Sequence, residues 1–325
     1  MSDAALMLGG VELGGTKCVC LVGNAGGEIL EQVSLPTGRD PAATLESIAT
    51  ILGGWQQRHG PYAAVGVASF GPLELRTDNP RYGFLGLSSK PGWSNVDLAG
   101  YFARRFRVPI GITTDVIGAA LAEGRWGAAR GLRHFAYVTV GTGIGVGVIV
   151  GGLPLVGRHH PELGHARAQR LPGDTWPGVC SFHGDCIEGI ACGPAIEARS
   201  GAPAGTLSPE HPVWEPVGHA LGQLAHTLVA TFGPERILMG GGVATAQPHL
   251  FPRMRTELRR SLNGYLDIEH VPGGLDAYIS PPGLGRLAGP LGALTVAADA
   301  YASARGSARA APPGIARRAT DAGKI

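Results

Sequence analysis

Lysine is almost absent from this sequence of 325 residues. It occurs only as Lys17, Lys90 and Lys324, so arginine supplies nearly all of the positive charge. The 27 basic and 25 acidic residues leave a formal net charge of only +2. A charge this small gives no electrostatic case for a nucleic-acid partner or an anionic membrane surface. The shortage of lysine also makes Lys17, which stands in a glycine-rich turn, a residue of interest.

The sequence also lacks an apolar run long enough to cross a bilayer. Its most apolar stretch, from Phe135 to Val150, is interrupted by glycines and is shorter than a spanning helix needs. The first residues show no basic segment followed by an apolar run and a cleavage site, which a secretory signal would have. We therefore expect a cytoplasmic protein with no membrane partner.

Glycine, in contrast, is abundant: 53 glycines and 25 prolines indicate many turns and close backbone approaches. The length exceeds one ordinary hydrophobic core, so we expect two domains or two lobes folded as one unit. Segments 7–24 and 135–152 each predict two strands joined by a glycine turn, and helices follow each pair. Residues 304–325 show no apolar period and predict a disordered tail.

The first glycine turn contains Gly14, Gly15, Thr16 and Lys17 between two predicted strands. Glycines let backbone N–H groups approach phosphate oxygens, and the hydroxyl and ammonium groups add donors. The spacing of a Walker loop is absent. Taken alone, the segment is more often a plain hairpin turn.

The second glycine turn contains Gly141, Thr142 and Gly143. Val146 stands where the dinucleotide motif G-x-G-x-x-G needs its third glycine, and a strand rather than a helix is predicted to follow. Both features disfavour a Rossmann dehydrogenase. Because two phosphate-type hairpins are less expected by chance than one, the pair favours a nucleotide-binding protein.

Asp115 ends a predicted strand, GITTD, directly before a predicted helix. An isolated aspartate in this position is most often a helix N-cap. At a strand end between two lobes it can instead act as a general base, which takes the proton from a sugar hydroxyl as that hydroxyl attacks the γ-phosphate of ATP.

Five cysteines at uneven spacing argue against a disulfide framework. His165, Cys180, His183 and Cys186 offer four nitrogen and sulfur ligands, enough to close a tetrahedral zinc site. The residues between His165 and Cys180 form a loop that burial alone would not hold, which gives one zinc per subunit a structural role. A Cys180–Cys186 disulfide or unrelated buried thiols are the alternatives, and a reducing cytosol disfavours the disulfide.

Two carboxylates flank this loop, Glu162 in PELGH and Glu188 in CIEG. Surface carboxylates are usually only solvated. Beside a metal loop, however, they can accept hydrogen bonds from the vicinal hydroxyls of a sugar.

Together, GGVELGGTK, ITTDVIGAALAE, VTVGTGIGVGV, PELGH, CSFHGDC and ILMGGGV resemble the ROK family of sugar kinases over about residues 8 to 302. The resemblance implies an α/β fold of the two-lobed, actin-like type with ATP, Mg²⁺ and a hexose in the cleft. We expect residues 1–115 and a helix at 288–303 to form the first lobe and residues 116–287 the second. We also expect a homodimer.

The same motifs imply roles for individual residues. Asp115 would be the base, and Glu162, His165 and Glu188 would lie at the sugar, so that His165 would also ligate zinc. The expected ATP-binding residues are Gly14, Gly15, Thr16, Lys17, Gly141, Thr142, Gly143, Gly241 and Gly242.

GLSSKPGW and CSFHGDCIEG look more like the family's fructokinases than its glucokinases, which implies conversion of D-fructose to fructose 6-phosphate. A ROK kinase for mannose, glucose or an N-acyl hexosamine is the alternative. Glu12 stands where most of the family has an aspartate near magnesium, although fructokinase-like members share the glutamate. Thr114 precedes the base where many members have asparagine, which leaves the hexose open.

A kinase-like, sugar-sensing regulator is the alternative from another class. Regulators of this family carry a helix-turn-helix domain ahead of the kinase-like part, whereas here the first hairpin begins within ten residues of Met1. A catalytically inactive sensor would be expected to lose Asp115 or the glycine turns, and this sequence keeps them.

Overall fold

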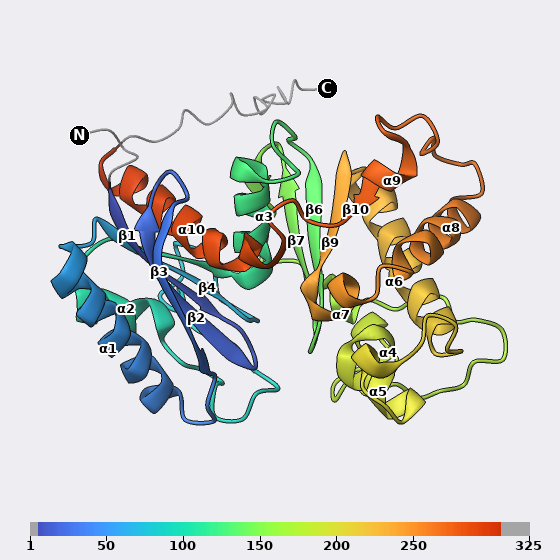
Figure 1. The fold of residues 1–325 in the computed structure, drawn as a ribbon, viewed down its shortest axis with the longest axis horizontal. Helices are drawn as coiled ribbons and strands as arrows, with labels where there is room; N and C mark the ends of the chain where they lie inside the picture. The colour runs from blue at the N-terminus through green and yellow to red at the C-terminus, as the bar shows by residue number, and fades with distance from the viewer. Residues whose placement is uncertain (1–5, 307–325) are drawn as a thin grey trace, which may run out of the picture.

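Two five-stranded sheets form two lobes that lie side by side (Figure 1). The computed structural model describes residues 6–306 of the chain. The strand order is β3-β2-β1-β4-β5 in the first sheet and β8-β7-β6-β9-β10 in the second. In both sheets the first three strands in sequence pair antiparallel and the last two run parallel. This shared topology confirms the predicted repeat and the α/β class.

The first sheet is covered on its outer face by two helices with clear sequence signals. Helix α1 begins after Asp40, whose side chain accepts from the N–H groups of Ala42 and Ala43, and it ends at Gly60. The elements of this lobe are β1 (Met7–Leu13), β2 (Lys17–Asn24), β3 (Ile29–Pro36), α1 (Pro41–His59), β4 (Ala64–Ser69), α2 (Leu98–Phe106) and β5 (Ile110–Thr114).

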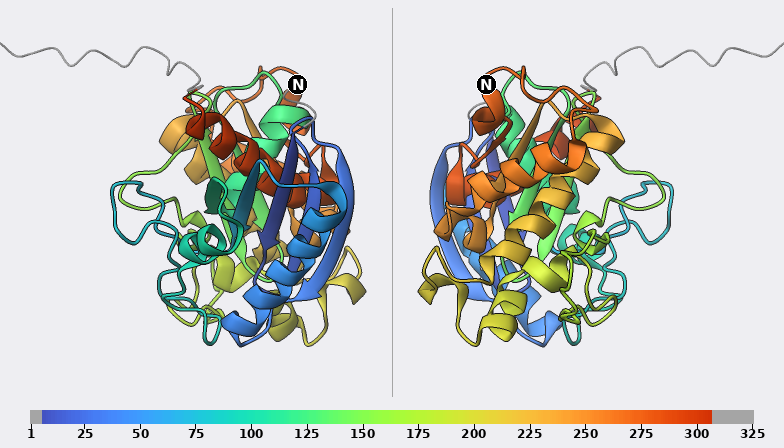
Figure 2. Two further views of the ribbon diagram at one scale, coloured as in Figure 1. Left: turned by 90° about the vertical axis from the view of Figure 1, so that its left-hand side faces the viewer. Right: turned by 90° about the vertical axis from the view of Figure 1, so that its right-hand side faces the viewer.

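Strand β3 did not emerge from the sequence pattern, which predicted only two strands before α1. It lies at the edge of its sheet and most of its side chains are exposed. An edge strand of this kind lacks the alternation of apolar and polar residues that marks a half-buried strand. Figure 2 shows α1 on the outer face of this sheet and helix α10 (Ala288–Ala304) on the inner face.

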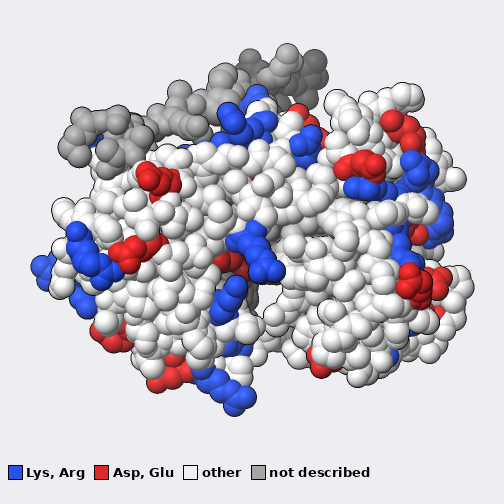
Figure 3. Space-filling view, in the orientation of Figure 1, with Lys and Arg blue, Asp and Glu red and all other residues white. Residues whose placement is uncertain are grey.

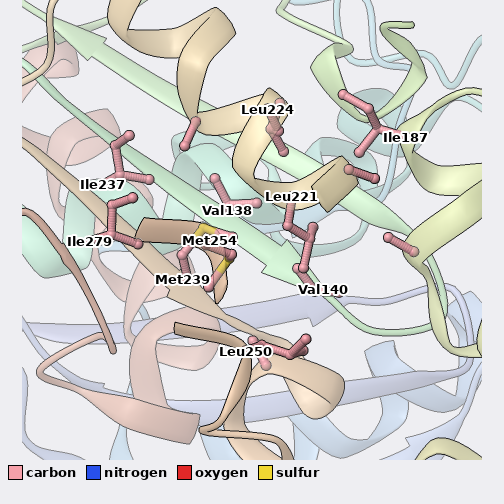
Figure 4. Close-up of a cluster of buried hydrophobic side chains, with 14 of the residues drawn as sticks. Val138, Val140, Ile187, Leu221, Leu224, Ile237, Met239, Leu250, Met254 and Ile279 are labelled. Atoms are coloured by element: carbon pink, nitrogen blue, oxygen red, sulfur yellow. The ribbon is translucent and has the colours of Figure 1, made fainter. Parts of the chain in front are cut away.

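The second sheet carries more helices on its outer face. Figure 4 shows Leu221, Leu224 and Met254 of α6 and α8 against Val138 and Met239 of the sheet. The elements of this lobe are β6 (Phe135–Val140), β7 (Ile144–Val150), β8 (Leu153–Pro154), η2 (Leu163–His165), α4 (Ile187–Ala191), α5 (Gly193–Ser200), η3 (Ala204–Thr206), α6 (Trp214–Phe232), β9 (Arg236–Gly240), α7 (Gly241–Ala246), α8 (Leu250–Leu262), α9 (Gly274–Tyr278), β10 (Ile279–Ser280) and η4 (Gly285–Leu287).

Two helices fill the space between the sheets, α3 (Asp115–Trp126) and α10. Each follows the last strand of one sheet, β5 or β10, so they are counterparts in the repeat. They pack closely because Gly118 and Gly292 face each other, and a side chain on Gly292 would collide with the backbone of Gly118. Helix α3 also packs on the second sheet and α10 on the first, so this pair joins the lobes.

One buried carboxylate, Glu123, binds both chain segments that cross between the lobes: the segment that leaves α3 and the segment that enters α10. Glu123, in the last turns of α3, accepts from the backbone N–H of Ala128 at 2.7 Å, of Gly283 at 3.0 Å and of Leu284 at 2.8 Å. Its side chain has no exposed surface. Because Ala128 leads from α3 into the second lobe and Leu284 leads from that lobe into α10, Glu123 ties the two crossings together.

The predicted lobe boundaries, 1–115 with 288–303 and 116–287, remain a prediction. The predicted disordered tail, 304–325, lies outside the described residues from residue 307 onward. Within residues 6–306, no helix is both long and apolar enough to cross a membrane.

Candidate active site between the lobes

The two glycine turns meet where the lobes face each other. The hydroxyls of Thr16, between β1 and β2, and of Thr142, between β6 and β7, lie 3.4 Å apart. Both residues are exposed. Figure 3 shows a hollow between the lobes with basic side chains beside it. Two hairpins distant in sequence therefore present backbone N–H groups and hydroxyls to one space.

The first turn is stabilised by hydrogen bonds within the turn and from Thr37. Gly14 donates its N–H to the carbonyl of Lys17 at 3.1 Å, and the Thr37 hydroxyl donates to the Gly14 carbonyl at 2.7 Å. Thr37 also donates its N–H to the carbonyl of Thr16 at 2.9 Å. No atom outside the neighbouring residues lies within 4 Å of a Cβ placed on Gly15, so the tip of the turn is open to a ligand.

The second turn is braced by a carboxylate and by a third glycine segment. Glu188 Oε2 accepts the N–H of Ile144 at 2.9 Å, directly after the turn. A Cβ placed on Gly141 would lie 3.7 Å from the N–H nitrogen of Gly242. Gly241 has φ of +86° and so little room beside Val140 that a larger residue would not fit. The predicted nucleotide residues of this lobe thus lie together, and α7 begins at Gly241, where the sequence predicted only a turn.

Asp115 is not the cap of α3. Thr114 is the N-cap, and its hydroxyl accepts the N–H of Ile117 at 3.2 Å. The interpretation of Asp115 as the cap is therefore wrong. Its carboxylate instead accepts the N–H of its neighbour Val116 at 2.9 Å. Burial raises the pKa of Asp115 to about 6, against hydrogen bonds from the backbone that lower it. Such a carboxylate is suited to accept a proton near neutral pH.

Glu12 adds a second perturbed carboxylate to this site. Burial and the charge of Asp115 raise the pKa of Glu12 to about 7, while Lys17 lowers it. Glu12 also lies beside Gly289 at the start of α10, where a side chain would collide with its carboxylate. Sequence reasoning noted Glu12 only as a departure from a family pattern. Its position as the penultimate residue of β1, on the face opposite Leu13, is the signal that links it to Asp115.

Glu162, His165 and Glu188 converge from the second lobe. The short η2 helix, which contains the last three residues of PELGH, lies on β7, and a side chain on Gly164 would collide with the carbonyl of Ile144. His165 Nδ1 lies 3.9 Å from Glu188 Oε1. Although 42% of the Glu162 side chain is exposed, burial of the carboxylate raises its pKa to about 7, and the charges of Asp115 and Glu188 add to this shift. These electrostatic couplings join the carboxylates of both lobes into one cluster.

His165, Cys180, His183 and Cys186 form the predicted four-ligand cluster, and their donor atoms lie within 4.8 Å of one another. Cys180 Sγ lies 3.7 Å from His165 Nδ1 and 3.6 Å from His183 Nδ1, and Cys186 Sγ lies 3.6 Å from His165 Nδ1. Bond lengths in tetrahedral zinc sites place sulfur and nitrogen ligands about 3.5 Å apart. The donor set and its spacing therefore fit a zinc ion.

All five cysteines have free thiols, so the alternative of a Cys180–Cys186 disulfide is not formed in this structure. Cys18 and Cys20 are buried in β2, as the sequence predicted. Cys192 is also buried and lies outside the four-ligand cluster.

The loop between His165 and Cys180 has a second means of support that the sequence did not reveal. Arg170 pairs with Asp174 and with Asp185, each at 3.0 Å, and Arg199 of α5 pairs with Asp174 at 2.9 Å. Ionic contacts thus hold the polar part of this loop, while the four-ligand cluster holds its ends.

Comparisons with known proteins agree with this architecture. The model of the ROK family matches residues 8–300. A fructokinase of Pediococcus pentosaceus is 38% identical over 92% of this chain and 100% of its own. A ROK hexokinase of Thermus thermophilus, 26% identical, superposes with a TM-score of 0.72 over 93% of this chain and 100% of its own.

A ROK glucokinase of Streptomyces griseus, solved with glucose and AMPPNP, is 22% identical and gives a TM-score of 0.72 over 90% of this chain and 99% of its own. This likeness concerns the fold alone, which is the two-lobed, actin-like arrangement expected from the sequence. With a family model matched over most of its length, the chain belongs to the ROK family.

Proposed function

We propose that this protein is an ATP-dependent kinase that converts D-fructose to fructose 6-phosphate in the cytoplasm. The observation that carries the proposal is the meeting of the two glycine turns at Thr16 and Thr142, with a cluster of carboxylates behind them. The glycine turns can bind the phosphates of a nucleoside triphosphate, and the carboxylates can bind the hydroxyls of a sugar. The similarity to fructokinases supports fructose as the acceptor.

In the proposed reaction Asp115 takes the proton of the C6 hydroxyl while that oxygen attacks the γ-phosphorus of ATP. The new O–P bond forms as the bond between the γ-phosphorus and the bridging oxygen of ADP breaks. Backbone N–H groups of the two turns, with Lys17, stabilise the charge on the phosphate oxygens. Glu12 offers a carboxylate, a ligand type that Mg²⁺ prefers, and would hold the magnesium that enters with ATP; the ion would supply further charge stabilisation on the phosphates.

Glu162, His165 and Glu188 are the proposed sugar-binding residues. Glu188 contacts the second turn through Ile144 and approaches His165, so one side chain connects the sugar side to the phosphate side. We propose that zinc bound by His165, Cys180, His183 and Cys186 fixes this arrangement. Because protein atoms would fill all four positions, zinc would have a structural role and no open position for chemistry.

A coupled assay of ADP release across a panel of hexoses tests the substrate. We expect the highest kcat/KM with D-fructose and lower values with mannose, glucose and N-acetylated hexosamines. A tenfold or greater preference for another hexose would replace fructose as the substrate and leave the kinase proposal in place. Sugar binding without ADP release from any hexose would favour the regulator over the enzyme.

We further propose a homodimer and the division of the chain into lobes at residues 115/116 and 287/288. Light scattering after size-exclusion chromatography measures the mass of the assembly directly. A mass of one chain at micromolar concentration would contradict the dimer.

A further inference from the structure

His160 connects the two lobes beside the proposed sugar site. It lies in the segment between β8 and η2, in the second lobe, and is only 6% exposed. Its Nε2 atom accepts the backbone N–H of Leu73 at 3.0 Å, and Leu73 follows β4 of the first lobe. Neither the glycine turns nor the metal cluster explains a buried histidine at this point.

The bond to Leu73 determines where the ring carries its proton. A nitrogen that accepts a hydrogen bond from a backbone N–H is unprotonated, so in the neutral ring the proton is on Nδ1. Burial lowers the pKa of His160, with the nearby charge of His159 acting in the same direction and the Pro161 backbone opposing it. The ring is therefore neutral at physiological pH and presents an N–H group from Nδ1.

That N–H group faces the carboxylate of Glu162. Nδ1 of His160 lies 3.6 Å from Glu162 Oε1, slightly beyond a hydrogen bond, and the Pro161 backbone is the other acceptor near the ring. Gly71 completes the contact, because a Cβ placed there would lie 3.1 Å from both Glu162 Oε1 and His160 Cε1. Glycine at this position leaves room for the carboxylate and the ring to approach the first lobe together.

We propose that His160 is a positioning residue that aims Glu162 at the sugar and couples this aim to the first lobe. Leu73 fixes the tautomer and the plane of the ring, and Nδ1–H then restrains Glu162 Oε1, which leaves Oε2 for a sugar hydroxyl. Because Leu73 belongs to the first lobe, a movement of that lobe would reach the ring through the Leu73 hydrogen bond. This inference rests on the proposed function only where it assigns Glu162 to the sugar.

Two substitutions separate the two contacts of the ring. In His160→Gln the side-chain oxygen can occupy the place of Nε2 and accept from Leu73, but no donor remains at the place of Nδ1. In His160→Asn the amide nitrogen can occupy the place of Nδ1 and donate to Glu162, but the acceptor for Leu73 is lost. His226→Gln is the matched control, since this half-buried histidine pairs with Ser261 at 3.0 Å on the outer helices.

We expect His160→Gln to raise the KM for fructose about tenfold, which corresponds to about 1.4 kcal/mol, with an unchanged KM for ATP and a near-normal melting temperature. His160→Asn should keep the KM for fructose within about threefold of wild type. It should also lower the melting temperature and speed hydrogen exchange at the Leu73 amide. The control should leave both KM values unchanged.

Equal KM values for fructose in the Gln and Asn variants would overturn the positioning role and leave His160 a structural bridge. Protection of the Leu73 amide that does not depend on the residue at 160 would overturn the bridge itself. Failure of the wild-type protein to phosphorylate any hexose would instead remove the proposed function, and the exchange experiment would still decide the bridge.

Discussion

The two lobes share one strand order but differ at the ends of equivalent strands. In the first lobe β5 is followed by Asp115, which begins α3, whereas its counterpart β10 is followed by Pro281 and Pro282. In the first lobe β4 leads to Gly71 beside Glu162, whereas its counterpart β9 leads directly into the glycines that begin α7. The first lobe thus provides the proposed base, and the second provides Gly241 and Gly242 of the proposed ATP site.

The connections after the third strand differ even more. In the first lobe this connection is mainly one capped helix, α1. In the second lobe it holds η2, the four-ligand cluster, α4, α5 and α6. The repeated topology thus brings equivalent strand ends of both lobes to the same space, and the residues at those ends determine the chemical role of each lobe.

The largest expected effect comes from the proposed base, Asp115, which follows the last strand of the first lobe. Asp115→Asn should lower kcat on the order of 10²-fold or more and leave the affinities for ATP and fructose within a few-fold, because a base acts in the transition state. Steady-state kinetics with calorimetric binding measures both. Retention of more than about a tenth of the wild-type kcat would assign Asp115 a structural role instead.

Asp115→Asn should lower activity but raise the stability of the fold. Burial raises the pKa of Asp115 from 3.8 to about 6, so the folded state binds the proton more tightly than the unfolded state and stability falls as pH rises through this window. A neutral asparagine avoids this cost, and we expect the melting temperature at pH 7 to rise by a few °C. In the wild type, kcat/KM should decline as pH falls below about 6 because the base becomes protonated.

The second prediction tests the proposed zinc site of the second lobe, formed by His165, Cys180, His183 and Cys186. Cys180→Ser should abolish stoichiometric zinc, lower the melting temperature and raise the KM for fructose about tenfold or more, since Glu162 and Glu188 lose their support. The KM for ATP should change little.

Cys192→Ser is the control, because Cys192 is buried nearby but contributes no donor to the cluster. Elemental analysis of protein purified without added metal should give one zinc per chain for wild type and for the control. Full activity and a normal melting curve with much less than one equivalent of zinc would contradict the structural role.

The smallest expected effect concerns the junction of the lobes. We expect fructose to close the lobes and reduce the radius of gyration in small-angle scattering. Glu123→Gln replaces an acceptor of three backbone N–H groups by a side chain with one acceptor, so closure should be incomplete and kcat and KM should change together by a few-fold.

Glu257→Gln is the matched control for the junction. Glu257 is also a buried carboxylate, 8% exposed, on α8, and it accepts hydrogen bonds from Gln223 and Arg260 away from the junction. It should lower the melting temperature without changing closure. A scattering profile of wild type that does not respond to saturating fructose would count against closure.

Local patterns were sufficient where the signal lies in neighbouring residues. The glycine turns and the spacing of Cys180, His183 and Cys186 were predicted because each depends on residues a few positions apart. Strand β3 was missed because its edge position weakens the apolar alternation. Asp115 could not be distinguished from a helix cap, because Thr114 and Asp115 are both capping residues and only the backbone shows which of them caps.

The sequence by itself determined the kinds of chemistry available to this protein: two phosphate-type turns, one carboxylate at a strand end, and four metal donors. Tertiary structure alone decided which groups act on one another. The contact of Thr16 with Thr142, the coupling of Glu12 to Asp115, the bridge from His160 to Leu73 and the anchoring of Glu123 all join residues far apart in the chain. A local pattern cannot encode these pairs, because their proximity arises only when two sheets pack around the α3–α10 pair.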